Sequence, residues 1–336
     1  MRKSAFAAIG AMLLAGSPDI ATAQGGDSTR PAASAAAATT ASPATVAAPA
    51  SAAYTPHRVY DTKRRRFIDL ETLIARIARD ADIAYLGEFH DDPGTHQLQA
   101  AILEGVARRR EGKVVLSLEM FERDVQPQLD AYLAGSTDEG AFLAASRPWP
   151  NYRGDYRPMV EFAKSRNWPV VGGNVPRRLA SVVARRGLTA LDSLPEADRP
   201  FVAAEHACPR NEYWERFRET MGDMSGHGMQ LTPEQVESMV WRTYEAQCVK
   251  DEAMAESIVR ARAAHSTLVV HANGSFHSNY RLGTVERVQR RDRRARQLVV
   301  SFQPVADLDA ADGRSQRKIG EYIVFTLAPA APTPAP

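Results

Sequence analysis

Residues 83–96 read Ile83-Ala84-Tyr85-Leu86-Gly87-Glu88-Phe89-His90-Asp91-Asp92-Pro93-Gly94-Thr95-His96 and predict a strand followed directly by a helix. The apolar run before Gly87 is typical of a buried strand. Asp92 followed by Pro93 is typical of a helix N-cap with proline in the first turn. Because alternate residues of a strand point the same way, we expect Glu88 and His90 to share one face where the strand ends.

A carboxylate and two imidazoles gather at this turn. His96 falls in the first turn of the predicted helix, where the positive end of the helix dipole favours a neutral imidazole. Turns between strand and helix are the usual place for ligands in an open parallel sheet. Alternatively, Glu88 and Asp92 only cap the turn and the histidines are surface residues.

Strands and helices alternate along the rest of the chain. This order favours an α/β fold with a mostly parallel sheet flanked by helices. The middle, about residues 191–262, is expected to be a helical insertion. Further strands are expected near residues 114–118, 170–174, 267–272, 297–303 and 322–327, and helices near residues 124–133, 138–146, 159–163, 176–187 and 211–221 and after Thr232 and Gly283.

Two polar residues interrupt an apolar stripe in the long helix that is predicted to start at Thr232-Pro233. Gln247 and Asp251 fall on the same side as Val240, Tyr244 and other apolar residues. Buried polar groups need partners. This stripe is therefore expected to face either a hydrogen-bond network or a cavity.

Both ends of the chain differ from its centre in composition. A basic start, an apolar run and Ala21-Thr22-Ala23 are typical of a secretory signal peptide over residues 1–23, and no later stretch predicts a membrane span. Residues 24–55 are rich in Ala, Pro, Ser and Thr and are expected to be a disordered tether, as are residues 328–336 at the other end. We therefore expect an exported, periplasmic protein with one α/β domain over residues 56–327.

Charge and cysteine content narrow the class of protein. The chain has 42 basic and 40 acidic residues, which gives no indication of a nucleic-acid partner. The two cysteines, Cys208 and Cys248, both lie in the exported part, so one disulfide is expected. The alternative is two free thiols that contact a metal or haem.

Three predicted strand ends carry polar side chains. Glu88 and His90 follow the first strand, Glu119 follows the second, and Asn273 and His277 follow a later one. The carboxyl ends of parallel strands meet at one edge of a sheet, so these residues are expected to converge. Such a group could bind a metal ion or perform acid–base chemistry. The sequence contains no P-loop, Gly-x-Ser-x-Gly, His-Glu-x-x-His or Cys-x-x-Cys motif.

Six segments, in order, resemble the ChaN family of haem-binding proteins, within the superfamily that includes Tiki proteases, TraB-type proteins and erythromycin esterases. The resemblance covers roughly residues 67–290. The matching segments are Leu86 to Asp91 with His96, Leu118 to Phe121 with Gln126, Tyr156 to Ala163, Asn174 to Arg177, Asp251 with Met254-Ala255, and Gly274 to His277 followed by Gly283.

The resemblance implies haem binding with a tyrosine as axial ligand, and paired haems between two subunits of a homodimer. Phenolate ligation of ferric haem is chemically sound. Tyr280 ranks first because it follows His277, and Tyr152, Tyr156, Tyr213 and Tyr244 are alternatives. The other cofactor-binding candidates are His90, His96, Glu119, Asn174, Asp251 and His277. Family members are often lipoproteins, but Ser17 stands where a lipoprotein would have cysteine, which favours a soluble periplasmic protein.

Two functions remain open at this point. The first is a periplasmic haem-binding protein in haem or iron uptake, whose partners would be outer-membrane or periplasmic uptake components. The second is a hydrolase in which Glu88 activates water, with His90 and His277 as acid–base partners or as ligands of a divalent metal. We prefer haem binding to enzymatic activity on the strength of the resemblance. A non-catalytic module that keeps the motifs for structure is a third interpretation.

Overall fold

In the computed structural model, which describes residues 55–222 and 232–329, an eight-stranded sheet forms the centre of the domain. The strand order is β2-β1-β8-β7-β3-β6-β4-β5. The strands from β8 to β5 in this order are all parallel, and β1 pairs antiparallel with both β8 and β2. The predicted α/β fold with a mostly parallel sheet is therefore confirmed. The strands are β1 (His57–Asp61), β2 (Arg66–Ile68), β3 (Ile83–Glu88), β4 (Val114–Glu122), β5 (Val170–Asn174), β6 (Leu268–Gly274), β7 (Gln297–Val305) and β8 (Tyr322–Leu327).

Helices follow most of the strands. The α-helices are α2 (Leu70–Asp80), α3 (Pro93–Arg109), α4 (Gln126–Leu133), α5 (Glu139–Ser146), α6 (Tyr152–Asp155), α7 (Arg157–Ser165), α8 (Arg177–Arg186), α9 (Glu212–Gly222), α10 (Pro233–His265) and α11 (Thr284–Arg291). Short 3₁₀ helices are η2 (Arg123–Val125), η3 (Leu188–Ser193), η4 (Glu196–Phe201), η5 (Ser275–His277) and η6 (Asn279–Arg281). No helix in these residues is long and apolar enough to cross a membrane.

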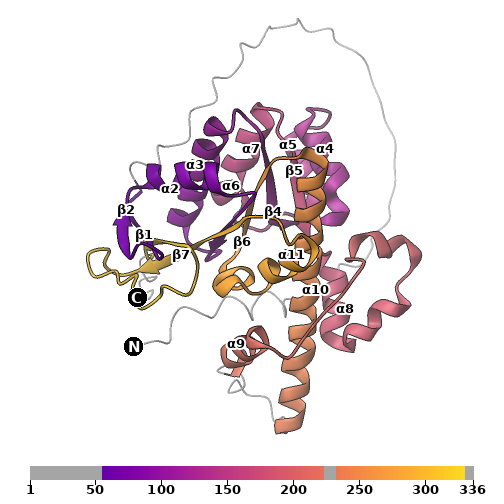
Figure 1. The fold of residues 1–336 in the computed structure, drawn as a ribbon. Coiled ribbons are helices and arrows are strands. Elements are labelled where there is room, and N and C mark those ends of the chain that lie inside the picture. Colours follow the sequence, from indigo (N-terminus) through magenta and orange to yellow (C-terminus); the bar gives the residue numbers. More distant parts are fainter. Residues whose placement is uncertain (1–54, 223–231, 330–336) are drawn as a thin grey trace, which may run out of the picture. The chain divides into compact units, whose positions relative to one another are not determined.

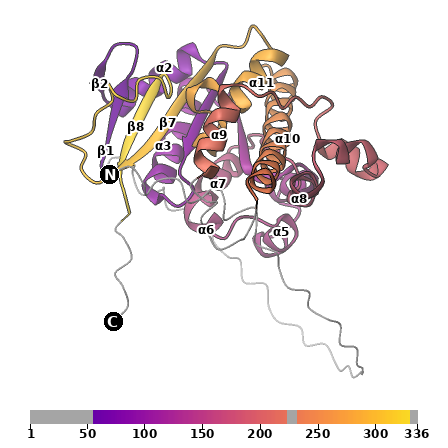
Figure 2. The same cartoon turned by 90° about the horizontal axis from the view of Figure 1, so that it is seen from below.

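Helices cover both faces of the sheet (Figures 1 and 2). On one face, α10 and α11 pack on alternate residues of the central strands, such as Tyr85, Val115 and Val269. On the other face, α3 packs against β3 and β8. Side chains alternate along a strand, so each strand end can offer polar groups to either face.

The N-terminal hairpin and α2 are features that the sequence pattern did not predict. The structure places Lys63 to Arg65 at the turn between β1 and β2. Buried Asp61 forms ion pairs with Arg64, at 3.2 Å, and with Arg76 from α2. Asp69 accepts a hydrogen bond from the backbone N–H of Thr72 and so caps α2.

The long helix α10 confirms the predicted helical region. Thr232 and Gln235 form a capping box at its start. The helix packs against β4, β5 and β6 as well as α8 and α11, so it is part of the cover of the sheet. Residues 1–54, the expected signal peptide and nearly all of the tether, lie outside the described residues, as do residues 223–231 and 330–336.

Cys208 and Cys248 form the predicted disulfide. It joins the segment before α9 to the first half of α10. The bond lies beside a cluster of buried residues, Tyr213, Trp214, Phe217, Met221, Val240 and Tyr244. The disulfide and this cluster together hold α9 against α10.

Candidate functional site

Glu88 is the centre of a hydrogen-bond network on the α3 face of the sheet. Its carboxylate lies 2.9 Å from Nδ1 of His90 and accepts hydrogen bonds from Gln99, at 2.7 Å, and from the hydroxyl of Tyr156. The Glu88 side chain is 1% exposed. Burial raises the pKa of Glu88, but His96, His90 and Tyr156 outweigh burial and the pKa is lowered. Glu88 is therefore a carboxylate at neutral pH.

His90 and His96, the two histidines between β3 and the first turn of α3, are held by this network. Nδ1 of His96 lies 3.0 Å from Oε1 of Gln99, and Nε2 lies 3.1 Å from the carbonyl oxygen of His90. His96 is buried, whereas the side chain of His90 is 21% exposed. Burial lowers the pKa of His90, but its hydrogen bond to Glu88 and the charge of Glu88 give a net rise. The alternative of surface histidines is therefore wrong for His96.

Asp92 caps α3 as the sequence predicted. Its carboxylate accepts a hydrogen bond from the backbone N–H of Gly94, at 3.1 Å, and others from Thr95 and Thr326. The chain thus turns directly from β3 into α3, which places Gln99 and His96 beside Glu88. Gln99 was missed by the sequence analysis, although its position three residues after His96 in a helix is a signal that could have indicated it.

A second network lies on the α10 face. Nδ1 of His277 is 2.8 Å from Asp251, and Nε2 is 3.2 Å from Glu119. Asp251 also accepts hydrogen bonds from Tyr213 and Thr284, each at 2.8 Å. The amide of Gln247 lies 3.1 Å from the ring of His277. The polar stripe predicted on the long helix therefore faces a network.

Two carboxylates hold His277 as an imidazolium. Burial alone would lower its pKa, but Glu119 and Asp251 outweigh burial and raise the pKa to about 9. The pKa of Glu119 is correspondingly far below its usual value, because His277 outweighs burial. At neutral pH the second network contains a buried cation between two anions.

Gly274 brings the two networks together. Its backbone N–H donates to Glu119 at 2.7 Å. A β-carbon at this position would lie 2.9 Å from the ring of His90 and 3.5 Å from Glu119. Only a residue without a side chain lets His90, from one face of the sheet, approach Glu119, from the other. The predicted convergence of the strand ends at one edge is therefore confirmed.

Tyr280 differs from the other tyrosine candidates in its exposure. Tyr152, Tyr156, Tyr213 and Tyr244 are at most 1% exposed, whereas Tyr280 is partly exposed. Its backbone is left-handed, with φ 62°, and its N–H donates to the carbonyl oxygen of Ile319 at 2.7 Å. The guanidinium of Arg216 lies 3.5 Å from the centre of its ring. Of these five, Tyr280 is the tyrosine that a ligand can reach with the least rearrangement.

Asn174 does not cap a helix. It ends β5 and is 8% exposed, and its Oδ1 has no hydrogen-bond partner among the described residues. The N-cap of α8 is Pro176, which makes no side-chain hydrogen bond. Asn174 therefore lies at the same edge of the sheet with an amide oxygen that accepts no hydrogen bond from the described residues.

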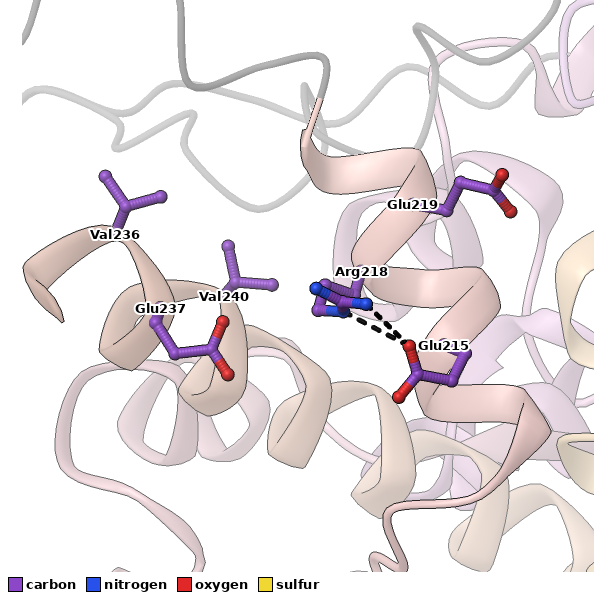
Figure 3. A pocket seen from close by; sticks show the side chains of 6 residues that line it. All are labelled: Glu215, Arg218, Glu219, Val236, Glu237 and Val240. Atoms are coloured by element: carbon purple, nitrogen blue, oxygen red, sulfur yellow. Dashed lines mark hydrogen bonds and ion pairs between the residues drawn. The ribbon is translucent and has the colours of Figure 1, made fainter. Parts of the chain in front are cut away.

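Within the ranges 55–222 and 232–329, no group of three or more His, Cys, Asp or Glu side chains is arranged to hold a metal ion. The alternative of a divalent metal on His90 and His277 gains no support from these residues. A cavity of about 530 Å³ lies between α9 and the start of α10 (Figure 3). Its lining contains none of the predicted site residues; it consists of Glu215, Arg218, Glu219, Val236, Glu237 and Val240.

Comparisons with known proteins agree with the fold. Residues 74–288 match a family model described as haem-binding uptake, Tiki superfamily, ChaN. No curated protein matches the chain significantly. The fold is similar to ChaN of Campylobacter jejuni, solved for its cofacial haem binding, with a TM-score of 0.61, 18% identity, and coverage of 81% of this chain and 97% of that one. The type III effector HopBA1 is also similar, with a TM-score of 0.45, 12% identity, and coverage of 77% and 93%.

Proposed function

The chain belongs to the haem-binding uptake family of the Tiki superfamily, the ChaN family, and from this premise we propose that it binds haem at the carboxyl edge of its sheet. The observation that carries the proposal is that the family match, residues 74–288, spans both polar networks and Tyr280. We further propose that the protein is exported to the periplasm and handles haem in uptake, together with outer-membrane or periplasmic uptake components.

The residues at this edge fit a haem. Tyr280 offers a phenolic oxygen, a known type of axial ligand for ferric haem. Trp149 offers aromatic surface beside His90, because the two rings pack edge-on with their centres 4.6 Å apart. The partly buried Phe276 offers further aromatic surface. When bound, haem would supply an iron centre. The protein's own residues would hold the macrocycle, provide the Tyr280 phenol, and keep Glu88 and Glu119 charged and ordered.

The other predicted residues have supporting parts in this proposal. His90 is the exposed member of its network and would contact the ligand. His96, Glu119, Asp251 and His277 are buried and would fix the loops that carry His90 and Tyr280. A homodimer holding two haems face to face is the corresponding assembly, by analogy with the cofacial binding in the C. jejuni protein.

Replacement of Tyr280 tests the axial ligand. Tyr280→Phe should abolish or strongly shift the Soret band of the haemin complex and weaken binding. Tyr60→Phe is the matched control, because the Tyr60 hydroxyl has no hydrogen-bond partner among the described residues and β1 lies toward the far side of the sheet. Unchanged spectra for Tyr280→Phe would assign the iron to another residue.

A hydrolase is the second candidate, and the paired histidines and carboxylates favour it. Glu88 with His90, at 2.9 Å, and Glu119 with His277, at 3.2 Å, could supply a base and an acid to a water molecule. Glu88→Gln distinguishes the two functions. Hydrolysis of ester or peptide substrates should be lost in this variant, whereas haemin binding should survive.

A further inference from the structure

Helix α9 is anchored beside the loop that follows β6. The hydroxyl of Tyr213 donates to Asp251 at 2.8 Å, and its ring packs against Phe276 with ring centres 5.0 Å apart. The disulfide between Cys208 and Cys248 joins the segment before α9 to α10. The position of α9 relative to this loop is therefore fixed at several points.

Arg216, about one turn after Tyr213 in α9, stacks on Tyr280. Its guanidinium carbon lies 3.5 Å from the centre of the tyrosine ring. A cation at this distance is attracted to the ring, and more strongly where the pair is partly withdrawn from water. The Arg216 side chain is 32% exposed. Because the guanidinium lies over the face of the ring, it leaves the phenolic oxygen at the edge of the ring uncovered.

Glu212 sets the orientation of this guanidinium. Its Oε1 accepts hydrogen bonds from Nε of Arg216, at 3.1 Å, and from Nη2, at 2.7 Å. Both N–H groups donate in the plane of the guanidinium, which leaves its face to the tyrosine ring. The Glu212 side chain is 62% exposed, so water screens its charge more than that of Arg216. Arg216 therefore keeps a positive field at the ring of Tyr280.

Two successive residues of the Tyr280 turn have a left-handed backbone. The angle φ is 62° at Tyr280 and 61° at Arg281. Residues other than glycine adopt this conformation at a cost and mainly where surrounding contacts hold it. Arg281 is held by Glu321, at 2.7 Å, and by the carbonyl oxygen of Gln297, at 3.2 Å. The stacked guanidinium of Arg216 adds a contact that holds the phenol itself.

A cation over the ring also suits the chemistry expected of a ligand of ferric haem. Tyrosine binds ferric iron as a phenolate, so its phenol gives up a proton to water on ligation. The negative charge that develops is shared between the oxygen and the ring, and a guanidinium stacked on the ring stabilises it. Arg216 would favour the ligated form of Tyr280 in this way without contacting the iron.

We propose that Arg216 is a positioning residue for Tyr280, which holds the phenol in place and stabilises it as a phenolate on the iron of haem. This inference rests on the haem-binding function proposed above and on Tyr280 as the axial ligand. Arg216 acts through the phenol, so its contribution should disappear when the phenol is absent. That dependence separates Arg216 from residues that only hold α9 in place.

A double-mutant cycle between Arg216 and Tyr280 tests the inference. Haemin is titrated into wild type, Arg216→Met, Tyr280→Phe and the double variant, followed by the Soret band. Arg216→Met keeps a long side chain of similar helix propensity and removes the charge. It should weaken haemin binding roughly tenfold and move the Soret band toward that of Tyr280→Phe. In the Tyr280→Phe background, the same change should have little further effect.

Two further variants complete the test. Arg216→Lys keeps the positive charge and should bind haemin more tightly than Arg216→Met. Arg218→Met is the matched control, because Arg218 lies on the same helix and pairs with Glu215 at 2.8 Å (Figure 3), much as Arg216 pairs with Glu212 at 2.7 Å. Arg218→Met should bind haemin as the wild type does.

Two results would overturn the inference while haem binding stands. One is an affinity and a Soret band of Arg216→Met equal to those of wild type. The other is an equal loss of affinity on Arg216→Met with and without the Tyr280 hydroxyl, which would mean that Arg216 serves only the packing of α9.

Failure of the proposed function would look different. The wild-type protein would then give no saturable titration, or Tyr280→Phe would leave the Soret band unchanged because another residue binds the iron. Either result would also remove the basis of the inference on Arg216.

Discussion

Nε2 of His277 lies 3.2 Å from Oε1 of Glu119, and both groups are almost completely buried. Glu119 belongs to β4 and His277 to the turn after β6, two strands that are neighbours in the sheet. The pair therefore fixes the loop that continues to Tyr280. Its charge state determines how firmly this loop is held.

The first prediction concerns pH and stability. The pKa of His277 is raised from 6.5 to about 9. A group whose pKa is higher in the folded protein than in the unfolded one stabilises the fold fully at pH values below its unfolded pKa. This stabilisation is lost as the pH rises through its folded pKa. The free energy of unfolding should therefore fall between about pH 6.5 and 9, by on the order of 3 kcal/mol. Urea unfolding at a series of pH values measures this change.

The His277→Gln variant provides the control for that series. It should be less stable than wild type at pH 6 and should lack most of the fall between pH 6.5 and 9, because Glu119, Asp251, Gln247 and Tyr213 would face no titrating group. An identical pH profile in both proteins would show that His277 is not the group responsible.

The second prediction concerns Gly274. Gly274→Ala would place a β-carbon 2.9 Å from the ring of His90, so the ring must rotate away from Glu88. Haemin binding should weaken severalfold because the His90 ring is displaced. The fold should be retained, because the ring is the far end of a side chain and can move without shifting the backbone. Gly154→Ala is the control, since an added β-carbon there meets no atom within 4 Å. Equal binding by both variants would exclude His90 from the ligand site.

The third prediction concerns the disulfide. The bond closes a loop with a sequence separation of 40, and the chain-entropy model assigns such a loop about 4 kcal/mol of stabilisation. Cys208→Ala/Cys248→Ala should lower the free energy of unfolding by roughly 2–4 kcal/mol. Reductant should destabilise wild type but not the double variant. A wild-type protein that is insensitive to reductant while its thiols become titratable would contradict this estimate.

Much of this site could be predicted from local sequence. The run into Gly87, the Asp92-Pro93 cap and the polar pair Gln247 and Asp251 each follow from periodicity or capping rules, and the structure confirms them. The convergence of Glu88 and Glu119 at one edge followed from the expected parallel sheet. The local features depend on a few neighbouring residues, and the convergence depends only on the alternation of strands and helices, which is why a single sequence reveals them.

Other features depend on distant contacts. Glu88 and Glu119 face opposite sides of the sheet because of the strand register. No short sequence motif predicts that register. The β1–β2 hairpin is held by a salt bridge from Asp61 to Arg76 in the next helix.

The most direct test of the central claim is a haemin titration of the purified protein, followed by its Soret band. The account predicts a saturable shift with a defined stoichiometry, and a complex that Tyr280→Phe alters and Glu88→Gln retains. A titration that never saturates, or a spectrum equal to that of free haemin at every ratio, would contradict it.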